Sequence, residues 1–412
     1  AMGSGTTTDA ANGTIAIGAD ALNALTTGGN NTAVGYKALA VNTTGANNTA
    51  IGHNALSGSQ NVGDANTAVG SSALANFNPD TDDHGHNSGL GYEAGASTTT
   101  GTENTYVGSG AGYRNATGDN NTYVGYAAGK GASGQSHSSN TAVGKMALTA
   151  ITTGGLNVAM GLEAGYAITD GHDNVFVGAA AGVGTTTIGY ATAIGRSAMR
   201  GVATADADGT VAVGYEALKA LTEGVGNVAI GYQAMDGLTD EDFSTAVGFQ
   251  ALSGIAGSAG HNANTAVGYQ AGLAISTATD NTAIGMQALA AEDTGSRNIA
   301  IGTQALYSQN VDGNTNNIAV GAFAGYRNVT GTDNTYVGTS AGLGTAGGAV
   351  SNGYNVGIGS HALTAITDGI SNVVIGRRAG DALTSGDANV FIGADAGTSS
   401  QLVENAVVIG KD

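Results

Sequence analysis

The residues best suited to chemistry gather in the segment 76–86, which carries three carboxylates and two histidines. Calcium binds clustered carboxylate oxygens in proteins, so the first interpretation is a calcium site at 80–84. The alternative, which the composition favours, is a solvated acidic turn that holds no ion and stays exposed for contact with a ligand. The residues concerned are Asp80, Asp82 and Asp83 as metal ligands, and Asp80, His84 and His86 as ligand contacts.

A second pattern, Gly-Lys-Gly-Ala-Ser-Gly at 129–134, has the glycine spacing of a dinucleotide-binding loop. Such a loop needs a strand before it and a helix after it, and the neighbouring residues do not suggest either. Catalysis would also need acids and bases that converge on one face. The recurrent polar residues of this chain change identity from one copy of its repeat to the next, so we expect no enzyme, and no cofactor beyond the calcium considered above.

One motif, Asn-Thr-Ala-Val-Gly and its variants, recurs along the whole chain. Its glycine is numbered position 0 here, and the step between copies is 17 residues in 15 of the 22 intervals and 18 to 21 in the others. Position −1 is aliphatic in every copy. The 23 copies place position 0 at glycines 18, 35, 52, 70, 91, 108, 125, 144, 161, 178, 195, 214, 231, 248, 268, 285, 302, 321, 338, 359, 376, 393 and 410.

Short alternating segments rich in β-branched residues and closed by glycine are typical of a strand followed by a turn. A strand and a return path in 17 residues make one coil of a stack with a spacing of about 4.8 Å. We therefore predict an all-β fold, a parallel β-roll or β-solenoid of about 23 coils. It forms one continuous domain over 5–412, and residues 1–4 are an expression scar. The return of 111–125 at 324–338 indicates duplication of a 12-coil block.

Two positions of the motif have a clear structural meaning. Asparagine recurs at −4, as at Asn31 and Asn48, where stacked coils would align the amides into a hydrogen-bonded column. The position 0 glycines Gly35 and Gly52 mark the turn.

Aromatic residues at −2 occur only where position +4 is glycine. Tyr106 pairs in this way with Gly112, and Tyr123 with Gly129. A large residue needs a small one opposite it in a close-packed interior, so positions −2 and +4 should share one packed layer.

Strand alternation suggests that −1 and −3 point into the coil, which would leave −2 and position 0 outside as a stripe of alanine and glycine. Such a stripe is larger than a soluble monomer normally exposes, so we expect oligomerisation. Tyrosines at +1 could form an exposed column for glycans or proteins, or could equally cover coil edges or subunit seams. They are Tyr36, Tyr92, Tyr126, Tyr215, Tyr232 and Tyr269.

The chain has 412 residues, no cysteine and a net charge of −19. This charge repels nucleic acid and anionic lipid, so neither is an expected partner. No apolar run reaches the length of a membrane helix. We expect contact with a membrane only through an anchor outside these residues.

The motifs Asn-Thr-Ala-Val-Gly and Asn-Val-Ala-Ile-Gly resemble the Asn-Ser-Val-Ala-Ile-Gly repeat of the YadA-like heads of trimeric autotransporter adhesins. They are also similar to repeat arrays in phage tail-fibre proteins and in fibre proteins of marine bacteria. The resemblance covers about residues 12–410, although the period of this chain is longer than that of the adhesin heads. It implies a homotrimer of β-rolls outside the cell, on a bacterial surface or a virion fibre.

These observations predict an adhesin head or receptor-binding fibre that attaches to a protein or glycan of a host-cell or environmental surface. Loops on a rigid scaffold are where recognition usually lies. The alternatives are a structural spacer without a ligand and an ice-binding solenoid, which needs flat ranks of threonine. Threonine at −3 gives one such rank, and we expect it to face inward. The contact loops predicted are 75–86, 130–139, 201–208, 254–263 and 343–353.

Overall fold

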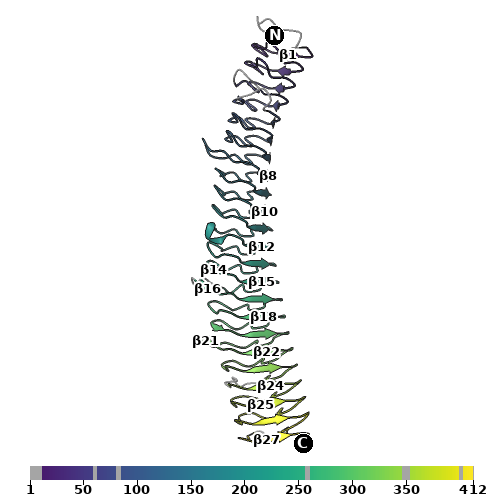
Figure 1. The fold of residues 1–412 in the computed structure, drawn as a ribbon, viewed down its shortest axis with the longest axis vertical. Helices are drawn as coiled ribbons and strands as arrows, with labels where there is room; N and C mark the ends of the chain where they lie inside the picture. Colours follow the sequence, from purple (N-terminus) through teal and green to yellow (C-terminus); the bar gives the residue numbers. More distant parts are fainter. Residues whose placement is uncertain are drawn as a thin grey trace. The chain divides into compact units, whose positions relative to one another are not determined.

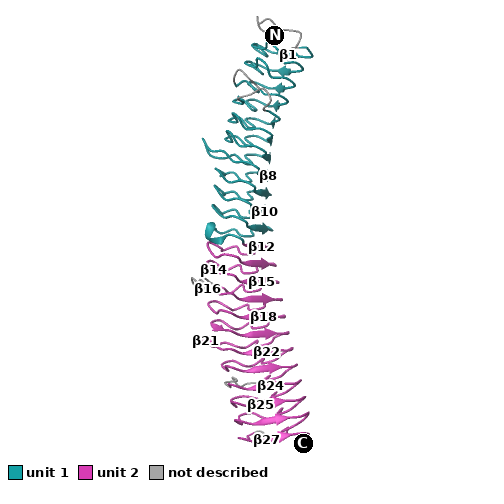
Figure 2. Cartoon of the chain, viewed as in Figure 1, with its two compact units in different colours: residues 1–209 teal, residues 210–412 magenta. Residues whose placement is uncertain are grey.

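The chain forms two compact units, residues 1–209 and residues 210–412 (Figure 2). The computed structural model describes residues 12–58, 63–79, 85–255, 260–345, 353–398 and 402–411. Each unit contains the same kind of coil, repeated along the sequence. None of the described residues forms a helix with the length and hydropathy needed to cross a membrane.

The first unit is a parallel stack of three-residue strands that follow one another in chain order (Figure 1). Its strands are β1 (Ile15–Ile17), β2 (Thr32–Val34), β3 (Thr49–Ile51), β4 (Thr67–Val69), β5 (Ser88–Leu90), β6 (Thr105–Val107), β7 (Thr122–Val124), β8 (Thr141–Val143), β9 (Val158–Met160), β10 (Val175–Val177) and β11 (Thr192–Ile194). A short 3₁₀ helix, η2 (Ala205–Ala207), follows the last of them.

The second unit repeats this arrangement. Its three-residue strands are β12 (Val211–Val213), β13 (Val228–Ile230), β15 (Thr245–Val247), β17 (Thr265–Val267), β18 (Thr282–Ile284), β20 (Ile299–Ile301), β22 (Ile318–Val320), β23 (Thr335–Val337), β24 (Val356–Ile358), β25 (Val373–Ile375), β26 (Val390–Ile392) and β27 (Val407–Ile409). Two-residue strands pair in the loops, β14 (Glu241–Asp242) with β16 (Gly260–His261) and β19 (Gly295–Ser296) with β21 (Gly313–Asn314).

The register is the one that the repeat predicts. Each strand covers positions −3 to −1, and equivalent positions lie side by side, as Thr32 beside Thr49 and Ala33 beside Ala50. Where the step between copies grows from 17 to 21 residues, as between β4 and β5, the pairing is unchanged. Extra residues are therefore accommodated in the loops, and the predicted parallel β-solenoid is confirmed in both units.

Position 0 is glycine because of a close backbone approach. Gly35 has φ +136°, and its N–H donates to the carbonyl of Ile17 in the preceding coil at 2.8 Å. A Cβ on Gly35 would lie 2.4 Å from the carbonyl oxygen of Gly52. Both the backbone conformation and the contact therefore exclude a side chain at this position.

The strands face the opposite way from the prediction. The central residue of the strand, position −2, is buried, whereas −3 and −1 point away from the interior, as Thr32, Ala33 and Val34 show in β2. The expected outward stripe of alanine and glycine is thus wrong, because the −2 alanines are inside. The coil is too narrow to hold two bulky residues of each strand, and instead takes one small or aromatic side chain.

The interior consists of a few columns of residues. Alanine at +3 and leucine, methionine or glycine at +4 join position −2, and a further column comes from position +7, which the sequence analysis did not single out. This column contains both aliphatic residues, such as Ile151 and Leu221, and polar ones, such as Asn115 and Glu292. Burial raises the pKa of the Glu292 carboxyl, although nearby backbone N–H groups, that of Gly295 first, oppose the shift.

Positions −2 and +4 share one packed layer, as predicted. The rings of Tyr106 and Tyr123 are fully buried and stack on each other with centroids 5.8 Å apart. In each of these layers, the residue at position +4 is a glycine that lies against the ring. A Cβ on Gly112 would lie 2.3 Å from the Tyr106 ring, and one on Gly129 would lie 2.4 Å from the Tyr123 ring.

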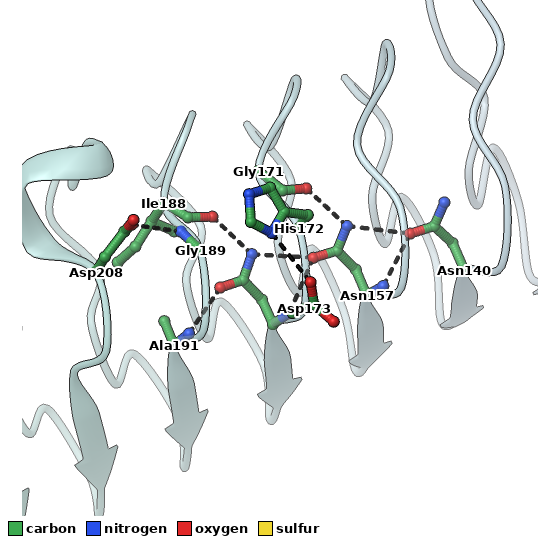
Figure 3. Close-up of polar contacts among 10 residues, drawn as sticks. Asn140, Asn157, Gly171, His172, Asp173, Ile188, Gly189, Ala191 and Asp208 are labelled. Carbon is green, nitrogen blue, oxygen red and sulfur yellow. Dashed lines mark hydrogen bonds and ion pairs between the residues drawn. The ribbon is translucent and has the colours of Figure 1, made fainter.

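The −4 asparagines form the predicted hydrogen-bonded column. The Asn31 side-chain oxygen accepts the backbone N–H of Asn48 at 2.9 Å, and the Asn31 amide donates to the Gly45 carbonyl at 2.8 Å. Figure 3 shows the same arrangement at Asn140 and Asn157, and the run of asparagines in the first unit is interrupted at Ala191. Since all these groups are buried, the column satisfies backbone donors and acceptors that would otherwise be costly.

Candidate interaction surfaces

The predicted calcium ligands Asp80, Asp82 and Asp83 lie outside the described residues, as does His84. The neighbouring His86 is described and exposed, and its backbone N–H donates to the Asp64 carbonyl at 3.2 Å. Within the described ranges, no three histidine, aspartate or glutamate side chains come together in a group that could hold a metal ion. The calcium site therefore stays a prediction.

The outward side of the strands in each unit, made of positions −3 and −1, is called here the outer sheet face. No copy of the motif has a charged residue at either position, although the chain carries a net charge of −19. Neighbouring coils cover part of each side chain, and Ile51, Ile230 and Ile375 remain about two-fifths exposed. The face is thus uncharged and partly open to solvent, and its −1 positions are aliphatic throughout.

Hydroxyl groups form a rank on this face in the first unit. Position −3 is threonine or serine in seven successive coils, and an aliphatic residue at −1 of the same strand lies on the same face in each coil. These residues are Thr32, Thr49, Thr67, Ser88, Thr105, Thr122 and Thr141. The expectation that −3 faces inward is wrong, since all seven are part-exposed or exposed.

An aromatic column runs along position +1 of the second unit. Tyr215, Tyr232, Phe249 and Tyr269 stack in succession, with centroids 5.1, 5.1 and 5.4 Å apart and planes within 18° of parallel. Each inner ring covers the faces of its neighbours, so mainly ring edges meet solvent. The prediction named the tyrosines and missed Phe249, which its position +1 would have identified.

A ladder of side-chain amides lies next to this column at position +2. The Gln233 amide donates to the Glu216 carboxylate at 3.0 Å, and the following steps are 2.9 to 3.2 Å. The hydrogen bond from Gln233 is the main cause of a lowered Glu216 pKa, and Tyr215 and Lys219 add to it. The glutamines of the ladder are Gln233, Gln250, Gln270, Gln287 and Gln304.

The same column is discontinuous in the first unit. Tyr36 stacks on His53 with centroids 5.4 Å apart, and the Lys37 ammonium lies 5.3 Å from the Tyr36 centroid. Farther along, Tyr92 and Tyr126 lie two coils apart, and Ser109 occupies position +1 of the coil between them. A surface hollow of about 260 Å³ opens there.

The predicted contact loop at 130–139 contains a buried imidazole. His137 is 1% exposed, and its Nδ1 lies 2.7 Å from the Tyr123 hydroxyl. Burial lowers the His137 pKa to about 4. This part of the loop packs into the coil, and irregular residues rather than a helix follow 129–134, so the glycine pattern there lacks the context of a dinucleotide-binding loop.

Of the other predicted contact loops, 201–208 includes η2, whereas 75–86, 254–263 and 343–353 lie partly outside the described residues.

A capping aspartate at position −6 is a feature that the sequence analysis missed. Asp64 accepts the backbone N–H of Ala46 in the preceding coil at 2.7 Å, and Asp119 accepts that of Thr102 at the same distance. The Asp208 side chain accepts the backbone N–H of Gly189 in the same way. Their constant offset from the motif glycine was the available signal.

Comparison with protein-family models and with curated proteins finds no match for this chain. The resemblance to YadA-like heads therefore remains a prediction from the repeat motif.

Proposed function

We propose that this chain is an extracellular fibre segment, an adhesin head or receptor-binding rod, that works as a homotrimer and attaches to a surface. The observation that carries the proposal is the outer sheet face. Each unit exposes an aliphatic residue at −1 in every described coil, which is more contiguous apolar surface than soluble monomers usually leave uncovered.

A second copy of this chain is the occupant that best suits the outer sheet face. Two molecules with a charge of −19 repel each other over most of their surfaces, and positions −3 and −1 are free of charge in all 23 copies. Copies can therefore meet there without burying unpaired charge. The number three comes from the resemblance to trimeric adhesin heads.

Attachment would use the loops, because the strand register is constant while loop length varies between copies. Recognition on a rigid scaffold commonly uses such loops. The competing role is a spacer, in which the loops bind nothing. The setting that fits either role is a bacterial cell surface or a virion fibre.

Light scattering tests the assembly. The monomer mass is 39.8 kDa, and we expect about three times this value for the wild-type chain. Val267→Lys with Ile284→Lys places two charges on the outer sheet face and should give monomers. The charge-matched control, Thr303→Lys with Thr339→Lys, changes position +1 and should stay trimeric. A stable wild-type monomer at micromolar concentration would overturn the proposal.

Binding of the purified trimer to cells, matrix proteins and a glycan array tests attachment. Replacement of the 201–208 loop by a short turn from a 17-residue copy should reduce binding without lowering the melting temperature. If nothing binds above background, and the variant supports adhesion as well as the wild type within the whole parent protein, the spacer role is correct.

The outward threonine rank favours ice binding as a second candidate. Seven hydroxyl residues recur at the coil spacing beside aliphatic residues, on a regular parallel sheet. Ice and a second copy would compete for this face. Ice-crystal shaping by the wild type, lost in Thr105→Lys with Thr122→Lys, would support this candidate, and unshaped crystals would eliminate it.

A further inference from the structure

At position +1 of the second unit, successive coils each supply an aromatic ring, and these rings form a continuous stack on the surface. In the second unit, four successive rings stack at one ring per coil, with centroids 5.1 to 5.4 Å apart. The inner rings Tyr232 and Phe249 are 44% and 41% exposed. Most of their flat surface is covered by the neighbouring rings.

The first unit has the same line of positions with one ring missing. Tyr92 and Tyr126 occupy +1 of the first and third of three successive coils, and the middle coil supplies Ser109. Two steps of the coil repeat separate the tyrosines by about 10 Å. They are 56% and 57% exposed, more than the rings of the complete column, as expected where a neighbour is absent.

The resulting hollow, called here the tyrosine slot, is lined by more than the two rings. Its polar groups are the Glu93 carboxylate, the Ser109 and Tyr113 hydroxyls and the Lys130 ammonium, and its volume is about 260 Å³. At Gly110, a Cβ would meet no atom within 4 Å, which shows that the floor is open. Two aromatic side chains thus border a space rimmed by groups that donate and accept hydrogen bonds.

The Glu93 carboxylate follows Tyr92 directly in the chain and lines the same hollow. Hydrogen bonding to Glu93 and then its negative charge raise the Tyr92 pKa, so the hydroxyl stays protonated and able to donate to a ligand.

We propose that the tyrosine slot binds one pyranose unit of a glycan, with the sugar ring between Tyr92 and Tyr126 in the place of the missing ring. The apolar C–H faces of the sugar would contact the tyrosines, and its hydroxyls would bond to Glu93, Lys130 and Ser109. A flat aromatic ligand could also enter the gap, but it would cover these polar groups without pairing them, which costs affinity. The inference names the ligand class for the proposed attachment function and rests on it.

The test uses methyl pyranosides of glucose, galactose, mannose and N-acetylglucosamine, observed by saturation-transfer difference NMR with the full chain. At least one should receive magnetisation on its ring protons and bind in a titration. Ser109→Tyr completes the column, as Tyr232 does in the second unit, and should weaken binding at least tenfold. Ala179→Tyr adds a ring at the same position of a coil whose +1 neighbours are Leu162 and Arg196, and should leave binding unchanged.

Circular dichroism of both variants shows whether the fold is intact, and Tyr126→Ala gives a second route to the loss of binding if Ser109→Tyr fails to fold. The proposal is overturned if none of the four pyranosides binds the wild type, or if Ser109→Tyr binds as well as the wild type. It is also overturned if N-acetyltyrosinamide binds the slot more tightly than every pyranoside. Light scattering and cell attachment are separate measurements, so failure of the fibre proposal remains distinguishable from failure of the slot.

Discussion

The ring of Tyr123 fills the space in which a side chain at Gly129 would begin, since a Cβ there would lie 2.4 Å from the ring. Residue 129 has φ +54°, and the equivalent Leu148 of the next coil has φ +50° with Ala142 at its −2 position. The same backbone therefore accepts different ways of filling the interior. In some coils position −2 is aromatic and +4 is glycine, and in others −2 is small and +4 is leucine or methionine. Five further coils combine a non-aromatic residue at −2 with glycine at +4.

This exchange predicts how substitutions combine. Tyr123→Ala should destabilise the first unit by about 2 to 4 kcal/mol, because it opens a cavity and removes the partner of His137. Gly129→Leu alone should also destabilise, since its Cβ meets the Tyr123 ring. The double variant reproduces the Ala142 and Leu148 arrangement and should recover part of the loss. Urea denaturation of the three variants checks this, and strictly additive losses would show that the two positions are independent.

The asparagine column predicts a strong effect at Asn157. Its amide donates to the Gly171 carbonyl at 2.9 Å, and its oxygen accepts from the backbone N–H of Asn174 at 3.2 Å. Asn157→Ala leaves both backbone groups buried without these partners, so we expect a loss of about 2 to 4 kcal/mol. Thr141→Ala changes an outward residue and should cost less than about 1 kcal/mol. Equal losses in thermal unfolding would refute a special role for the column.

Burial of His137 predicts a pH dependence. The pKa falls from the ordinary 6.5 to about 4, so between these values the unfolded chain binds a proton that the folded chain does not. This contribution to stability is complete above pH 6.5 and decreases as the pH falls toward 4, by on the order of 3 kcal/mol. His137→Gln cannot titrate and should lose less stability than the wild type over this interval. Denaturation curves at pH 7, 5.5 and 4 measure the difference, and parallel losses would contradict the assignment.

Close backbone contact predicts that position 0 tolerates no side chain. Gly35→Ala places a Cβ against the Gly52 carbonyl at a φ of +136°, and should cost at least about 3 kcal/mol. Gly134 is a matched comparison, because its φ is +76° and a Cβ there meets no atom within 4 Å. Gly134→Ala should therefore cost only about 1 kcal/mol, from backbone conformation alone. Similar melting temperatures for the two variants would show that the contact at Gly35 is unimportant.

The fold could be predicted from the sequence because each coil repeats the same local signals. The motif glycine fixed the turn, and the −4 asparagine fixed the hydrogen-bonded column. Which side of the strand faces inward was predicted wrongly, because an aliphatic residue at every −1 position normally indicates a core. The exchange between Tyr123 and Gly129 already contained the correct answer, since only residues inside the same confined space have to compensate in volume.

The surfaces were harder to predict. The sequence places Tyr92 and Tyr126 in a predicted column at position +1. The hollow between them depends on Ser109, and a single small polar residue does not by itself indicate a binding site. Phe249 was missed because only tyrosines were followed along position +1. The Asp64 cap and the buried His137 depend on contacts between coils, and a single copy of the motif gives no sign of them.

The asparagine column also makes the two ends of a run of coils chemically different. Each Asn side-chain oxygen points to the coil that follows, as Asn31 does toward Asn48, while the backbone N–H of the following coil points back. The Asn31 amide also points to the following coil, where it donates to the Gly45 carbonyl. A run cut after such a coil therefore leaves an asparagine oxygen and amide at its C-terminal end, and a run cut before it leaves a backbone N–H and a carbonyl at its N-terminal end. These two ends complement each other head to tail, so the column gives the stack a polarity.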